Sequence, residues 1–144
     1  MAKAKGKSKG IQPPVIAADE RRLRFSFQYL QPDHLRFPLS NCSKDYFEAL
    51  FREIIRYQAF TVGAFKEISP EEHRHPLTFS DTHETQGFPN IDPSADDLWT
   101  DDPWQFGLPS GKKGDPSRLW RVHGFIDSSV FYVVWLDPKH KLDC

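Results

Sequence analysis

The chain has 144 residues, of which 38% are hydrophobic and 14% aromatic, and its mean hydropathy is −0.60. That is enough apolar material for one domain with a core, but no apolar run approaches the roughly 18 residues of a membrane-spanning helix. The composition also excludes collagen, coiled coils, long repeat arrays and small disulfide-stapled proteins. We therefore expect one globular domain without a membrane partner.

Charge is distributed unevenly along the chain. Lys and Arg together number 19 and Asp and Glu 20, for a net charge of −1. Four lysines fall in the first ten residues, which contain no acid, so the rest of the chain is acidic. A basic arm on an acidic body argues against a protein that binds nucleic acid over its whole surface. We interpret residues 1–19 as a flexible basic arm and residues 20–144 as a single domain.

The cysteine pattern indicates a reducing compartment. Cys42 and Cys144 are the only two cysteines and form no CxxC motif. The apolar stretch near the N-terminus is broken by Pro13 and Pro14, so it makes a poor signal peptide. We therefore expect a cytoplasmic protein.

The first expected element is a strand over residues 21–30. Leu23, Phe25, Phe27 and Tyr29 alternate with polar residues, and this period of two predicts a half-buried strand.

Two helices are expected after it. Ser43 is a good N-cap, and the apolar residues that follow predict an amphipathic helix ending near Tyr57. Thr61 is a second N-cap candidate, before a short helix that Pro70 would stop. The apolar positions of the longer helix are Tyr46, Phe47, Leu50, Phe51, Ile54 and Ile55.

Residues 71–102 show no periodicity and become strongly acidic toward their end. No Lys or Arg occurs between Arg74 and Lys112. A segment of this length without secondary structure is unusual inside a compact domain and often carries function. We therefore expect a long acidic loop here.

The last third predicts an antiparallel meander of three strands. Residues 104–108 form a short strand candidate, and a turn with a basic tip at Lys112 and Lys113 follows. Residues 118–126 and 130–136 are two more strands, and the second is apolar throughout its centre. Such a run is typical of a central strand covered on both faces.

The expected fold class is therefore α+β: an N-terminal strand, two helices, a long acidic loop and a C-terminal antiparallel three-strand meander. The helices should cover one face of the sheet, and we expect a groove on the other.

This order of elements resembles that of the RelE/ParE superfamily of small bacterial toxins. The segment 118–140, RLWRVHGFIDSSVFYVVWLDPKH, is similar to the arginine-bearing hairpin of that family. The resemblance implies cleavage of messenger RNA on the ribosome and neutralisation by an antitoxin protein, although some members poison gyrase or do not cleave. RelE-type ribonucleases are usually basic, whereas this body is acidic, and the segment 81–102 has no counterpart in them.

Metal-independent RNA cleavage needs a base for the 2′-OH, an acid for the leaving oxygen and cations for the phosphate. Arg121 and His123 should project from one strand face, and Asp137 and His140 follow the adjacent strand. Asp137 could orient either imidazole. The candidate catalytic residues are Arg121, His123, Asp137 and His140, and the candidate substrate-binding residues are Arg118, Lys139, Lys112 and Lys113.

Other interpretations stay open. Asp-Pro after a strand is ordinary turn chemistry, and His123 could be a core imidazole. His73 and His75 with Asp81 are weak candidates for a metal site, and we otherwise expect no metal or cofactor. The acidic charge and the lack of a definitive catalytic motif also fit a non-catalytic protein-interaction or accessory module of a mobile-element or defence system.

Overall fold

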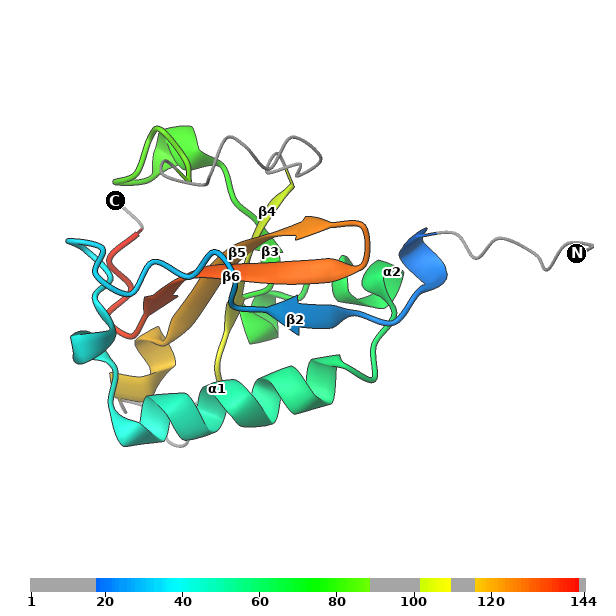
Figure 1. Ribbon diagram of the computed structural model, residues 1–144, viewed down its shortest axis with the longest axis horizontal. Coiled ribbons are helices and arrows are strands. Elements are labelled where there is room, and N and C mark those ends of the chain that lie inside the picture. The colour runs from blue at the N-terminus through cyan, green and yellow to red at the C-terminus, as the bar shows by residue number, and fades with distance from the viewer. Residues whose placement is uncertain (1–17, 89–101, 110–115, 143–144) are drawn as a thin grey trace, which may run out of the picture.

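The computed structural model describes residues 18–88, 102–109 and 116–142. Its centre is a five-stranded sheet of order β2-β6-β5-β4-β3, with α1 running along one side (Figure 1). This confirms the α+β class. The strands are β2 (Arg24–Ser26), β3 (His75–Pro76), β4 (Pro103–Gly107), β5 (Arg121–Asp127) and β6 (Val130–Asp137), and the α-helices are α1 (Lys44–Tyr57) and α2 (Val62–Phe65).

The expected C-terminal meander is present within this larger sheet. β4, β5 and β6 pair antiparallel in sequence order. β2 adds to the outer side of β6 in parallel, and the two-residue β3 extends the sheet beyond β4. β6 is therefore an interior strand, and its side chains belong to hydrophobic clusters on both faces, as its apolar sequence predicted.

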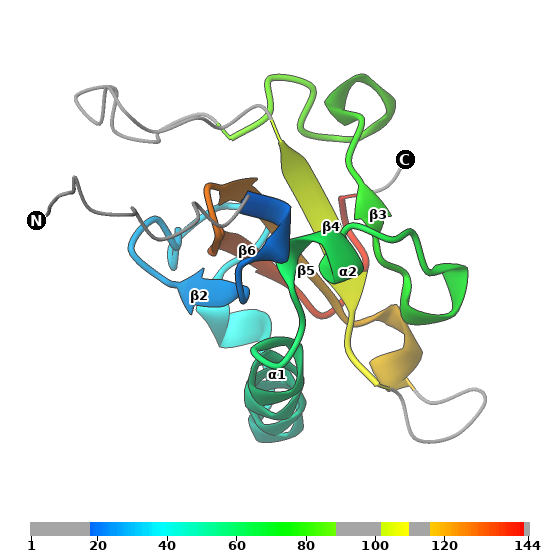
Figure 2. The same cartoon turned by 90° about the vertical axis from the view of Figure 1, so that its right-hand side faces the viewer.

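α1 begins where its sequence predicted. The Ser43 hydroxyl accepts a hydrogen bond of 3.1 Å from the Tyr46 N–H, which satisfies one of the free donors of the first turn. Figure 2 shows the helix nearly end-on beside the sheet. Its buried face is narrower than expected, because Phe51 and Ile55 are 52% and 69% exposed.

α2 is a single turn capped by Thr61, whose hydroxyl accepts from the Ala64 N–H at 3.1 Å. No α-helix of the described residues is long and apolar enough to cross a membrane.

The N-terminal strand is shorter than the predicted residues 21–30. It ends at Ser26, whose hydroxyl accepts from the Gln28 N–H, and a turn from Phe27 to Leu30 follows. Phe27 is consequently 38% exposed, while Tyr29 contacts Phe125 and Tyr132 on the sheet.

A β-bulge distorts the contact between β5 and β6. His123 lies opposite Trp135 and Gly124 opposite Val133, which leaves Val134 as the extra residue. Val134 and Trp135 both belong to the cluster on the face opposite the helices. A side chain at Gly124 would place its Cβ 2.1 Å from the Tyr132 carbonyl oxygen, so the close approach of the strands requires glycine there.

The face opposite the helices is covered, and the prediction of an open groove across it is wrong. The segment 27–42 passes over β6 (Figure 1), and the Trp135 indole N–H donates to Gln31 Oε1 at 2.8 Å. Segment 77–88 packs beside it through Leu77, Phe79 and Phe88. Aromatic side chains in these two irregular segments therefore build a second core where the sequence shows no periodicity.

Candidate functional site

Three of the four predicted catalytic side chains lie inside the molecule. His123 is 0%, Asp137 1% and Arg121 5% exposed. The His123 ring packs near those of Phe37 and Trp135, with centroids 5.9 and 6.4 Å away. The expectation that these three residues face a groove is therefore wrong, because the second core seals that part of the sheet.

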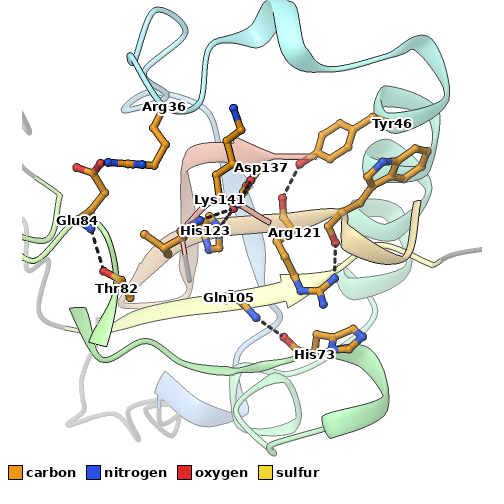
Figure 3. A network of polar contacts seen from close by, with 12 residues as sticks. Arg36, Tyr46, His73, Thr82, Glu84, Gln105, Arg121, His123, Asp137 and Lys141 are labelled. Atoms are coloured by element: carbon orange, nitrogen blue, oxygen red, sulfur yellow. Dashed lines mark hydrogen bonds and ion pairs between the residues drawn. The ribbon is translucent and has the colours of Figure 1, made fainter. Parts of the chain in front are cut away.

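Asp137 and His123 form a buried pair. His123 Nε2 lies 3.0 Å from Asp137 Oδ2, and the same carboxylate accepts from the backbone N–H groups of Lys141 at 2.8 Å and Leu142 at 3.1 Å (Figure 3). Burial alone would raise the pKa of Asp137, but its bonds to His123 and to the two N–H groups hold that pKa below the usual 3.8. The pair therefore fixes the turn that follows β6.

Arg121 ties together three parts of the fold. Its Nη1 donates to the carbonyls of Arg118 at 2.8 Å and Trp120 at 3.1 Å, while its own carbonyl accepts from the Tyr46 hydroxyl of α1 at 2.6 Å. Arg118 belongs to a 3-10 helix, η5 (Pro116–Leu119), although the sequence predicted a strand from residue 118. Arg121 therefore holds this helix against the start of β5.

A hollow of about 370 Å³ opens next to η5, at the end of β4. It collects residues from α1, from the turn before β3, from the end of β4 and from η5. The lining residues are Glu53, Arg56, Glu71, Glu72, His73, Gly107, Leu108, Pro109 and Arg118.

One wall of the hollow is a network of paired charges. Arg56 binds both Glu53 and Glu72, and the Tyr57 hydroxyl donates to Glu72 at 3.0 Å. Arg74 Nη1 lies 3.2 Å from the other Glu72 oxygen. Burial opposes the charge of Glu72, but these donors outweigh it and lower its pKa from the usual 4.5. The acidic charge of this wall is thus largely neutralised within it.

His73 lies at the rim of the hollow. Its backbone is left-handed, with φ of 53°, and its carbonyl accepts from Gln105 Nε2 at 3.4 Å (Figure 3). The ring rests on Gly107, where an added Cβ would come 2.9 Å from His73 Cδ2. The absence of a side chain at Gly107 is therefore what leaves room for this imidazole.

The surroundings of His73 favour a neutral ring. Partial loss of hydration lowers its pKa below the usual 6.5, and the positive charges of Arg121, His140, His75 and Arg118 lower it further. A neutral imidazole can accept a proton at neutral pH. The exposed Arg118 also lines the hollow, and no ion pair joins it to a carboxylate of residues 18–88, 102–109 or 116–142.

The predicted substrate-binding residues separate into three groups. Arg118 lines the hollow. Lys139 is exposed on the turn after β6. Lys112 and Lys113 lie outside the described residues.

The weak metal candidates do not form a site together. Among residues 18–88, 102–109 and 116–142, no three His, Cys, Asp or Glu side chains are grouped so that they could hold a metal ion, and this includes His73, His75 and Asp81. The two histidines instead flank Gln105, whose Nε2 lies 3.0 Å from His75 Nε2.

Sequence reasoning missed part of the hollow. Arg56 and Glu53 lie on an ordinary amphipathic helix, and Gly107 ends a short strand, so their patterns gave no functional signal. The run of two glutamates before His73, in a segment without periodicity, was the one local sign.

The comparisons with known proteins do not place the chain in a family: no protein-family model matches it, and searches of the curated proteins and of the solved structures found no match.

Proposed function

We propose that the protein is a RelE/ParE-like toxin that cleaves RNA without a metal ion, and that the hollow beside β4 and η5 is its active site. One observation carries the proposal: His73, with its lowered pKa, sits at the rim of a hollow that Arg118 and Glu71 also line. The hollow thus brings together a candidate base and a candidate cation, two of the three groups that this reaction requires.

In this reaction the neutral ring of His73 removes the proton of a ribose 2′-OH. The 2′-oxygen forms a bond to the adjacent phosphorus while the bond from phosphorus to the 5′-oxygen breaks. Arg118 stabilises the negative charge that grows on the phosphate. His140 returns a proton to the leaving 5′-oxygen, so that the products are a 2′,3′-cyclic phosphate and a 5′-hydroxyl. The proposal thus assigns functions to Arg118, which lines the hollow, and to His140, whose charge acts on His73, and gives His123 and Asp137 a structural role.

The experiment is cleavage of an end-labelled single-stranded RNA by the purified protein in excess EDTA. We expect cyclic-phosphate products, and a loss of about 100-fold or more in rate for His73→Ala and Arg118→Ala, because single acid–base groups contribute roughly 10²–10⁴-fold. Arg52→Ala, an exposed arginine on the far side of α1 from the buried stripe, is the matched control and should cleave normally.

Expression in bacteria gives a second measurement. The wild-type protein should arrest growth, and His73→Ala should relieve the arrest at equal protein level. The proposal would be overturned if the folded wild-type protein cleaved no RNA, or if His73→Ala and Arg118→Ala cleaved RNA at the wild-type rate.

A second candidate function is a non-catalytic interaction module. The observation that favours it is the outward apolar surface of Phe51, Ile55 and Phe27, in which the Phe27 and Phe51 rings lie 6.2 Å apart. Exposed apolar groups that contact one another are typical of binding surfaces. Binding of a partner that survives His73→Ala but is lost in Phe51→Lys, in a protein that cleaves no RNA, would favour this function.

A further inference from the structure

The turn after β6 is held from the protein interior. Asp137 Oδ1 accepts from the Lys141 N–H and Oδ2 from the Leu142 N–H, while His123 holds Oδ2 from the other side. Both members of the pair are almost fully buried, in a setting where hydrogen bonds to charged groups are strong. The conformation of residues 138–142 is therefore coupled to an imidazole on the neighbouring strand.

The turn starts at the same end of the sheet as the hollow. Gly107 pairs with Arg121, and Arg121 pairs with Asp137, so these three residues form one row across β4, β5 and β6. Neighbouring strands lie about 4.8 Å apart, which puts Asp137 about 10 Å from the glycine beneath His73. His140 follows three residues later on this turn.

His140 is itself held in an uncommon conformation. Its φ is 55°, a left-handed value that a residue with a side chain adopts at a cost of about 1 kcal/mol. The flanks impose it: Asp137 binds the backbone of residues 141 and 142, and the Leu142 side chain is 0% exposed in the second core. The Leu142 carbonyl also accepts from the His83 N–H at 2.9 Å.

We propose that the buried His123–Asp137 pair is a positioning device that fixes His140 as the proton donor of the site, an inference that rests on the proposed function. The pair does not touch substrate. It holds the turn that carries His140, and this turn starts from the same row of the sheet as Gly107, on which the His73 ring rests. The influence of the His140 charge on His73 agrees with this placement.

Two substrates distinguish an effect on the position of His140 from an effect on the stability of the fold. A dinucleotide has an alkoxide leaving group that needs a proton, whereas uridine 3′-(4-nitrophenyl phosphate) releases a phenolate that does not. We expect His140→Ala to reduce dinucleotide cleavage about 100-fold and aryl ester cleavage less than about threefold. Asp137→Asn and His123→Phe should show the same split, while His73→Ala should reduce cleavage of both substrates.

The variants include safeguards against unfolding. Circular dichroism and the melting temperature identify folded protein, and His123→Phe replaces the ring by one of similar size if Asp137→Asn is unstable. Ser43→Ala weakens α1 at a distant cap and serves as the stability control, with equal effects on both substrates. Wild-type protein that cleaves neither substrate refutes the proposed function itself. If the wild type cleaves both substrates, the positioning role alone is overturned by either of two results. Asp137→Asn and His123→Phe lose equal activity toward the two substrates, or they lose none.

Discussion

Replacing Asp137 by alanine tests how much of the fold depends on the buried pair. The substitution removes three hydrogen bonds to one carboxylate, from His123, Lys141 and Leu142. It also leaves His123 without its carboxylate at a site that is 0% exposed. Removing one member of a buried pair typically costs about 3–5 kcal/mol, and hydrogen bonds to charged groups are worth about 1.5–3 kcal/mol each. We expect the free energy of unfolding to fall by about 3–5 kcal/mol, since the three bonds share one group and are not additive.

Urea unfolding followed by tryptophan fluorescence measures this loss. The variant should unfold at lower urea with an unchanged slope, because the surface exposed on unfolding stays the same. The double variant His123→Leu/Asp137→Leu should recover part of the loss, because apolar residues avoid the cost of burying charge, while the N–H groups of Lys141 and Leu142 stay without their acceptor. A loss below about 1 kcal/mol in Asp137→Ala, or a double variant less stable than either single one, would refute the account of the pair.

Further predictions concern acid stability, two glycines and a cap. Because the pKa of Asp137 is lowered in the folded protein, its ionised carboxylate stabilises the fold fully above about pH 4. This stabilisation is lost as the pH falls through the pKa of the folded state. In an acid titration followed by circular dichroism, the wild type should therefore lose more stability below about pH 4 than Asp137→Asn does. Gly124→Ala should cost about 3 kcal/mol or prevent folding, because its Cβ would lie 2.1 Å from a carbonyl oxygen, and chemical denaturation measures this. Gly107→Ala should displace the His73 ring. Its rate of RNA cleavage, measured on the folded variant, should fall by more than its lower melting temperature explains. Ser43→Ala should cost about 1 kcal/mol in urea unfolding and leave cleavage by the folded protein unchanged.

The elements that sequence predicted well are those determined by local chemistry. Ser43 and Thr61 cap the helices that they were expected to cap, because a hydroxyl there satisfies N–H groups only a few residues away. The strand β6 was recognisable since a continuous apolar run of that length has to be buried on both faces.

What sequence could not supply depends on contacts between distant residues. Phe37 and Phe88 lie in irregular segments, and only the folded chain shows that Phe37 packs near His123 and that Phe88 packs on Trp135. The spacing of Arg121 and His123 on one strand was sufficient to place them on one face but not to say whether that face is open. The hollow was missed for the same reason, since its lining residues Arg56 and His73 come from different parts of the chain, the helix α1 and the turn before β3.

The pairing of β2 with β6 has a consequence for how the protein is made. Arg24 lies opposite Val130, so β2 can find its partner only after β6, the last of the described strands, has been synthesised. Until then Phe25 and its neighbours have no sheet to join, and closing so long a loop is slow. Synthesis from the N-terminus therefore leaves β2 unpaired until β6 has been made, and an unpaired strand edge favours association with other chains during that interval.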